Sequence, residues 1–174
     1  MINVNLNNIE IAGSGFGRQD PPAGGYVCRI ISTRVDEKKQ CLFVDLDIAE
    51  GDYADHFRDV HDRTGYWFLT LPRSFKPRAL PFFKRFTHVA EQSNQDYWWT
   101  GDETKLEGLL IGATIYREEY IGNDGKKKSR TKVDEVYTVD QIRAGKFKTP
   151  EDKPLEEEQR PAATVFASEE DIPF

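Results

Sequence analysis

Residues 41–48 read Cys-Leu-Phe-Val-Asp-Leu-Asp-Ile. Leucine, valine and isoleucine occupy every even position, whereas Phe43, Asp45 and Asp47 occupy odd positions. Side chains of a β-strand alternate between the two faces of its sheet, so this pattern predicts a strand whose even-numbered face is core. The protein is therefore expected to be built around a β-sheet.

The segments on both sides of residues 41–48 carry further strand patterns. Residues 26–35 are rich in valine and isoleucine, and a charged turn at 36–39 joins them to residues 41–48 as a hairpin. A second hairpin is predicted around Gly122-Asn123-Asp124-Gly125, because these residues tolerate the positive φ angles of tight turns. The predicted strands are 26–35, 41–48, 66–71, a fourth from about 109 to 121, and 129–138. Residues 52–63 are predicted to be a loop.

One amphipathic helix is predicted between the third and fourth strands. Phe82, Phe83, Phe86 and Val89 recur at three- and four-residue spacing within residues 81–93. A capping-box pattern at residues 138–141 predicts a short helix after the fifth strand. The order of three strands, one helix and two strands matches the five-stranded OB-fold barrel, and a small β-sandwich is the alternative architecture.

Charge divides the chain into a body and a tail. The 174 residues carry a net charge of −6, and residues 149–174 alone carry −6, so the remainder is neutral. Prolines and acids in the tail predict disorder, as do prolines and glycines near residue 22 for an N-terminal arm. We expect an arm at 1–25, one mainly β domain at 26–148, and a disordered acidic tail at 149–174.

The second hairpin combines bases with aromatic residues. Cations neutralise phosphates and aromatic rings stack on bases, so this combination is typical of a site for single-stranded nucleic acid. A merely solvated hairpin tip would carry similar lysines. Two aromatic and two basic residues on the first three strands are further candidates. The predicted DNA-binding residues are Arg29, Arg34, Phe43, Trp67, Tyr116, Tyr120, Lys126, Lys127, Lys128, Arg130, Lys132 and Tyr137.

Signals for enzymatic chemistry are weak. Asp45 and Asp47 share a strand face as in some two-metal nucleases, although any exposed strand face gives this pattern. The three histidines lack zinc-site spacing, and no phosphate-binding loop or nucleophile motif is present. We expect a protein that is not an enzyme and holds no cofactor or metal.

Two further features concern the environment of the protein. Cys28 and Cys41 lie in apolar stretches outside any CxxC pair, and we expect reduced, buried thiols. Without a long apolar run or a signal peptide, a soluble, cytoplasmic protein is expected.

The sequence ends in Glu169-Glu170-Asp171-Ile172-Pro173-Phe174. This segment resembles the acidic tip of bacterial and phage single-stranded DNA-binding proteins. Ile172 and Phe174 can enter an apolar pocket, and the acids suit a basic rim. The resemblance implies an OB-fold protein that coats single-stranded DNA independently of sequence in phage replication, recombination and repair. It also implies that residues 169–174 recruit partner proteins, in the host cytoplasm.

Two other functions stay open from the sequence. One is a metal-dependent nuclease that uses Asp45 and Asp47, and the other is a protein-only adaptor that does not touch DNA. The sequence also leaves open whether the protein forms a homo-oligomer.

Overall fold

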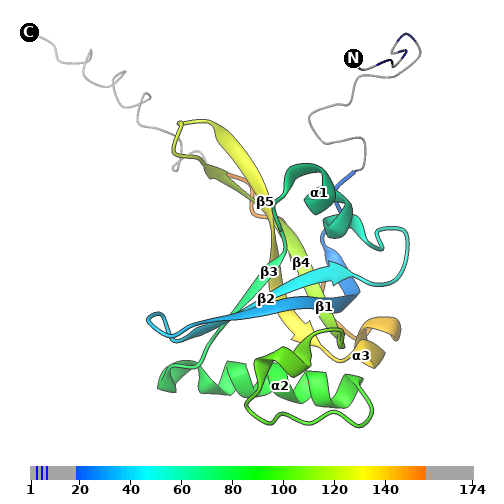
Figure 1. Cartoon of the computed structure of the whole chain (residues 1–174). Helices are drawn as coiled ribbons and strands as arrows, with labels where there is room; N and C mark the ends of the chain where they lie inside the picture. The colour runs from blue at the N-terminus through cyan, green and yellow to red at the C-terminus, as the bar shows by residue number, and fades with distance from the viewer. Residues whose placement is uncertain (1–2, 4, 6, 8–18, 156–174) are drawn as a thin grey trace, which may run out of the picture.

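The computed structural model describes residues 19–155 together with residues 3, 5 and 7. This part of the chain contains one five-stranded antiparallel sheet with the strand order β3-β2-β1-β4-β5 (Figure 1). The strands are β1 (Gly24–Asp36), β2 (Cys41–Ile48), β3 (Thr70–Ser74), β4 (Leu110–Ile121) and β5 (Lys127–Tyr137). The helices are α1 (His56–Thr64), α2 (Leu80–Ser93) and α3 (Val139–Arg143), with short 3-10 turns η1 (Pro77–Ala79) and η2 (Glu103–Leu106). The predicted mainly β architecture, with a helix between the third and fourth strands, is confirmed.

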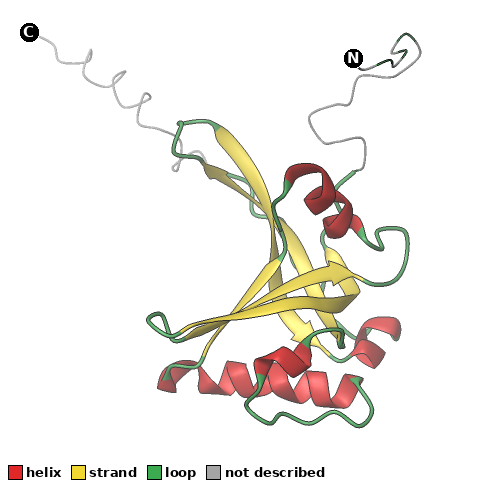
Figure 2. Ribbon diagram, viewed as in Figure 1, coloured by secondary structure: helices red, strands yellow, loops and turns green. Residues whose placement is uncertain are grey.

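The sheet is strongly curled but not closed by hydrogen bonds. Register shifts between Ile30 and Ser32 in β1, and opposite Thr114 and Ile115 in β4, increase the local twist. The edge strands β3 and β5 come into contact, although no ladder joins them in the described residues. Helix α2 runs across one end of the curled sheet, and α1 lies near the other end (Figure 2).

The core lies inside the curl of the sheet. Leu42, Val44, Leu46 and Ile48 are at most 1% exposed, so the predicted core face of β2 is confirmed. Helix α2 contributes Phe86, which is fully buried. Cys28 and Cys41 are free and buried, as expected, and burial raises the pKa of the Cys28 thiol to about 12.

Replacing Phe86 with alanine should therefore lower the free energy of unfolding by about 3–5 kcal/mol, because the substitution leaves a large cavity in the core. Urea denaturation measures the loss. Phe82→Ala is the matched control, since Phe82 is 63% exposed on the same helix and should change stability by less than about 0.5 kcal/mol. Equal losses in the two variants would contradict this placement of α2.

Two predicted elements differ from the structure. Residues 56–64, which fall largely within the predicted loop, form helix α1. The Asp47 carboxylate in β2 accepts hydrogen bonds from the backbone N–H groups of Phe57 (3.0 Å) and Arg58 (3.2 Å) in the first turn of α1. The third strand spans Thr70–Ser74 instead of 66–71. Residues 66–69 join β2 only through the bond from Leu46 N–H to the Leu69 carbonyl (2.9 Å), whereas the pairing with β2 continues past Pro72 to Ser74.

The chain after β5 packs on the outer side of the sheet. Thr138 and Gln141 form the predicted capping box at the start of α3. Val139 and Ile142 of α3 pack over β1 and β4, where Gly112 leaves room for the Ile142 side chain. Within the described residues, no helix is long and apolar enough to cross a membrane.

A short strap continues from this layer to the second hairpin. Lys153 donates its backbone N–H to the Arg117 carbonyl (2.8 Å) and accepts from the Glu119 N–H (2.9 Å). Asp152 accepts from the Arg117 backbone N–H (2.8 Å). Residues 152–153, which the sequence assigns to the tail, thus line the free edge of β4.

Candidate nucleic-acid interface

The β4–β5 hairpin carries a ladder of alternating aromatic, acidic and basic residues on its outer face. Cross-strand pairing places Tyr116 opposite Lys132, Glu118 opposite Arg130 and Tyr120 opposite Lys128. These six residues share one face because side chains two apart in a strand point the same way. We call them the hairpin ladder.

The Arg130 side chain connects the members of the hairpin ladder. Its guanidinium lies 4.6 Å from the centre of the Tyr120 ring and donates from Nε to Glu118 Oε2 at 2.7 Å. Lys132 Nζ lies 3.6 Å from the same carboxylate oxygen. The hydrogen bond from Arg130 is the main cause that lowers the pKa of Glu118. This arrangement holds a flat cation over one face of a half-exposed tyrosine ring, where cation and ring can act together on a phosphate and a base.

The whole hairpin has an excess of positive charge. Residues 116–132 contain six bases and three acids, giving a net charge of +3. Lys127 pairs with Glu119 at 2.5 Å and Lys128 with Asp124 at 3.6 Å, while Lys126 is exposed in the turn. Exposed ion pairs contribute little, about 0–1 kcal/mol each, so phosphates can replace these carboxylates at low cost.

Tyr116 differs from the other predicted aromatics of the hairpin. It is only 5% exposed, and Lys153 Nζ of the strap lies 4.7 Å from its ring centre. The strap therefore covers Tyr116 and adds another cation beside the hairpin ladder. Tyr120 stays half-exposed and is the tyrosine of this face that a base can reach.

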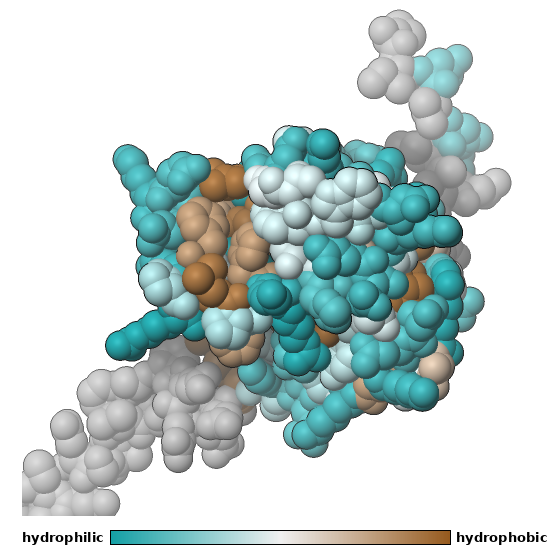
Figure 3. Space-filling model, turned by 90° about the horizontal axis from the view of Figure 1, so that it is seen from below, coloured by the Kyte–Doolittle hydropathy of each residue, from teal (hydrophilic) through white to brown (hydrophobic). Residues whose placement is uncertain are grey.

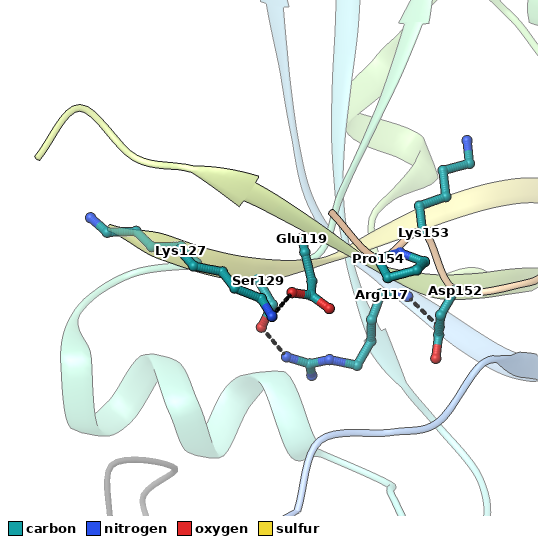
Figure 4. A pocket seen from close by; sticks show the side chains of 8 residues that line it. Arg117, Glu119, Lys127, Ser129, Asp152, Lys153 and Pro154 are labelled. Atoms are coloured by element: carbon teal, nitrogen blue, oxygen red, sulfur yellow. Dashed lines mark hydrogen bonds and ion pairs between the residues drawn. The ribbon is translucent and has the colours of Figure 1, made fainter. Parts of the chain in front are cut away.

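The opposite face of the hairpin is a shallow pocket with mixed charge. It is lined by Arg117, Glu119, Lys127, Ser129 and residues 152–154, together with Lys128 of the hairpin ladder (Figure 4). Arg117 donates to Ser129 Oγ at 2.5 Å and pairs with Asp20 of the N-terminal arm. Asp20 also lies 3.3 Å from His56 of α1, and hydrogen bonding to His56 and Arg117 lowers its pKa. These contacts tie the arm and α1 to the base of the hairpin.

The β1–β2 hairpin forms a second basic and aromatic cluster. The Arg34 guanidinium lies 5.1 Å, and Lys39 Nζ 6.0 Å, from the centre of the Phe43 ring. Both predicted residues, Arg34 and Phe43, are thus brought together on the outer face of the sheet. In Figure 1 the turns of the β1–β2 and β4–β5 hairpins lie on the same side of the drawing, to the left of the sheet.

Two exposed aromatic rings were not among the sequence-predicted residues. Tyr66 is 69% and Phe68 51% exposed, and their ring centres are 6.3 Å apart. They share the face of Thr70 and Pro72, which pair with Asp45 and Phe43 in β2. The sequence signal for them is the run Tyr66-Trp67-Phe68-Leu69, in which strand alternation exposes the aromatic rings at even positions.

The neighbouring Trp67 has a structural role instead. Its indole N–H donates to the carbonyls of Leu46 (3.0 Å) and Leu69 (3.1 Å), and its ring packs on His61. These bonds fix the segment that presents Tyr66 and Phe68. Trp67 therefore supports the aromatic surface without being its most accessible ring.

Arg29 and Tyr137 lie apart from both hairpin turns. Arg29 is exposed but shares a shallow hollow with Asp47, Asp55 and Asp59. Tyr137 packs against Phe147, with ring centres 6.3 Å apart, and beneath the Arg85 guanidinium. The structure does not bring these two predicted residues into the same cluster as the hairpin ladder.

The two carboxylates considered for a nuclease already have partners within the fold. Asp45 accepts from Ser32 Oγ (2.9 Å) and Thr70 Oγ1 (2.6 Å) and lies 3.5 Å from Arg34. Asp47 is 2% exposed and holds the start of α1, and burial raises its pKa. In the described part of the chain, no group of three or more histidine, cysteine or acidic side chains is arranged to hold a metal ion.

Asp47→Ala should destabilise the protein by about 1–3 kcal/mol, because the first backbone N–H groups of α1 would lose their acceptor in a buried place. Thermal unfolding by circular dichroism measures the change. Asp62→Ala removes an acid whose side chain is 70% exposed in the same helix, so it is the control and should change stability much less. An unaffected Asp47→Ala protein would show that α1 does not need this cap.

The predicted partner-binding residues Glu169, Glu170, Asp171, Ile172, Pro173 and Phe174 lie outside the described residues. No protein-family model matches the chain, and no curated protein matches it significantly.

Proposed function

We propose that the protein binds single-stranded DNA without sequence preference, through an OB-like sheet face between its two hairpins. The hairpin ladder supports this most strongly, because it sets Arg130 on the Tyr120 ring between two lysines. The strand order is that of an OB barrel whose last two edge strands touch without pairing. Arg34 and Phe43 would form the second contact with the single-stranded DNA.

Each group has a separate task in this proposal. The lysines and arginines of the hairpins neutralise phosphates and release counterions, which makes affinity depend on salt. Tyr120, Phe43, Tyr66 and Phe68 offer faces on which bases of any identity stack. Residues 169–174 recruit proteins of phage replication or recombination to the coated strand, in the cytoplasm of the host.

A titration of fluorescently labelled oligo-dT, followed by anisotropy with and without magnesium, tests the proposal. Saturable binding without magnesium, with oligo-dC bound similarly, is the expected result. Magnesium-dependent shortening of the oligonucleotide that Asp45→Asn abolishes would instead favour a nuclease. A protein that binds no oligonucleotide at low salt would be a protein-only adaptor.

Alanine at Tyr66 and Phe68 should each weaken binding by about 1–3 kcal/mol if their rings stack on bases. The same anisotropy titration measures this loss. Phe82→Ala is a control of comparable exposure on the helix α2, which lies across the end of the sheet, and should leave the affinity unchanged. Equal affinities in all three variants would show that bases do not stack on Tyr66 and Phe68.

A further inference from the structure

Helix α2 leaves an apolar groove on its outer side. Its inner side chains are buried, but Leu80 is 48% and Phe82 63% exposed, and Trp98 in the following loop is 65% exposed. The groove between helix and loop is lined by Leu80, Phe83, Lys84, His88 and Trp99, among others. Figure 3, which views the molecule from the α2 end, shows hydrophobic side chains gathered in one patch. Such patches mark binding surfaces more often than chance exposure does.

The floor of the groove is held in place by contacts of its own. The Phe83 ring lies 5.6 Å from Trp99 and 6.3 Å from Phe75, both edge to face. The Trp99 backbone N–H donates to Glu91 at 2.9 Å, which fastens the loop to the helix. A ligand would therefore meet a preformed site and would not have to order it.

The end of the groove near the start of α2 is basic, whereas the acid that lines the groove, Glu91, already accepts the Trp99 backbone N–H. Lys76, Arg78 and Lys84 are exposed at or near the start of α2. None of the ion pairs found in the described part of the chain involves them, whereas Lys127, Lys128, Arg130 and Lys132 of the hairpin all have carboxylate partners. The groove thus suits a ligand that joins apolar side chains to negative charge.

We propose that this groove binds residues 169–174 of the protein itself. Glu169, Glu170 and Asp171 supply negative charge for the basic end of the groove, and Ile172 and Phe174 supply two apolar side chains. Pro173 restricts the backbone between them, which lowers the entropy lost on docking. No other part of the sequence joins three acids directly to an apolar segment of this kind.

The chain is long enough for this contact. Sixteen residues, and thus seventeen Cα–Cα steps, separate Leu155, the last described residue, from Ile172. Fully extended, they span about 60 Å, whereas a folded body of this size is about 35–40 Å across. The segment can therefore reach the groove of its own molecule as well as that of a neighbour.

Docking in the groove would make residues 169–174 an intramolecular ligand that competes with partner proteins. Ile172 and Phe174 would be withdrawn from water, and a partner protein would have to compete with the groove for them. The partner's measured affinity would then be reduced by the fraction of segments that are docked. This inference goes beyond DNA binding and holds or fails without it.

Photo-crosslinking of the full-length chain tests the contact. Phe174 is replaced with p-benzoyl-phenylalanine, the protein is irradiated without DNA, and the crosslinked peptides are identified by mass spectrometry. The expected crosslinks fall on residues 80–88 and on Trp98 or Trp99. Dilution distinguishes a contact within one molecule, whose yield is constant, from one between molecules.

Two groove variants and a control make the result decisive. Lys84→Glu and Leu80→Glu should each abolish the crosslink, and an acid near the start of a helix does not disturb folding. Lys105→Glu changes the same charge on an exposed turn and should retain it. Crosslinks concentrated on residues 126–132, or none at all, would overturn the proposal, as would crosslinks on α2 that both variants retain.

Discussion

Replacing Lys128, Arg130 and Lys132 together with glutamine is expected to weaken oligo-dT binding about 100-fold at about 0.1 M salt. Each neutralised phosphate on a single strand contributes about −0.7 to the slope of log affinity against log salt. Loss of three contacts should therefore flatten the slope by about 2, and the difference between variant and parent should shrink to about tenfold near 0.3 M salt. Anisotropy titrations at several salt concentrations measure both quantities.

The change should not act through stability. The three side chains are between 43% and 50% exposed, and substitutions at such positions usually change the free energy of unfolding by less than about 0.5 kcal/mol. Glutamine at Lys105, Arg143 and Lys146 removes one arginine and two lysines from exposed positions away from the hairpin ladder and is the matched control. If both triple variants lost affinity equally, net charge rather than the hairpin ladder would govern binding.

Strands β1, β2, β4 and β5 and helix α2 could be predicted from the sequence because their signals are local. The alternation in residues 41–48 gives β2 residue for residue, and the apolar spacing within 81–93 gives α2 to within one residue at its start. The capping box gives α3 in the same way. In each case the residues that form the element also carry its pattern.

Features that depend on distant contacts could not be predicted. Helix α1 begins where Asp47, ten residues before Phe57, supplies the acceptor for its first N–H groups. Tyr116 shares a strand face with Tyr120, yet Lys153, 37 positions away in sequence, covers its ring. The composition of residues 149–155 indicates a tail, but backbone pairing with β4 overrides composition at Lys153.

The candidate site residues also divide into those with local signals and those that depend on distant contacts. The exposure of the hairpin bases could be predicted, because residues next to a tight turn lie at the surface. Trp67 was a reasonable aromatic candidate, but its indole N–H is committed to two carbonyls of neighbouring strand segments. The exposure of Tyr66 and Phe68 follows from the structure, in which Leu69 is buried and Trp67 is partly buried on the opposite face.

Removing residues 156–174 is expected to raise the affinity for oligo-dT, with the largest effect at low salt. These residues contain six acids and one base, and they follow directly on the strap that ends beside the hairpin ladder. A tethered segment reaches an effective concentration on the order of millimolar. Its acids, above all Glu156, Glu157 and Glu158, which follow residue 155 directly, should therefore compete with phosphates for the hairpin cations, whether or not residues 169–174 occupy the α2 groove. Screening shortens the range of this competition to about 8 Å at physiological salt, so parent and truncated protein should converge as salt rises.

A neutralised tail of the same length distinguishes the effect of the tail's charge on DNA affinity from the effect of its bulk. Replacing its six acids with glutamine or asparagine, with Ile172, Pro173 and Phe174 unchanged, should raise DNA affinity as much as the truncation does. Capture of replication or recombination proteins should be lost on truncation, because the apolar side chains are then absent. If the neutral tail left DNA affinity at the parent value, the truncation would act by removing bulk rather than charge. In that case the tail would shield the hairpin ladder sterically, and the salt dependence of the two proteins would stay parallel.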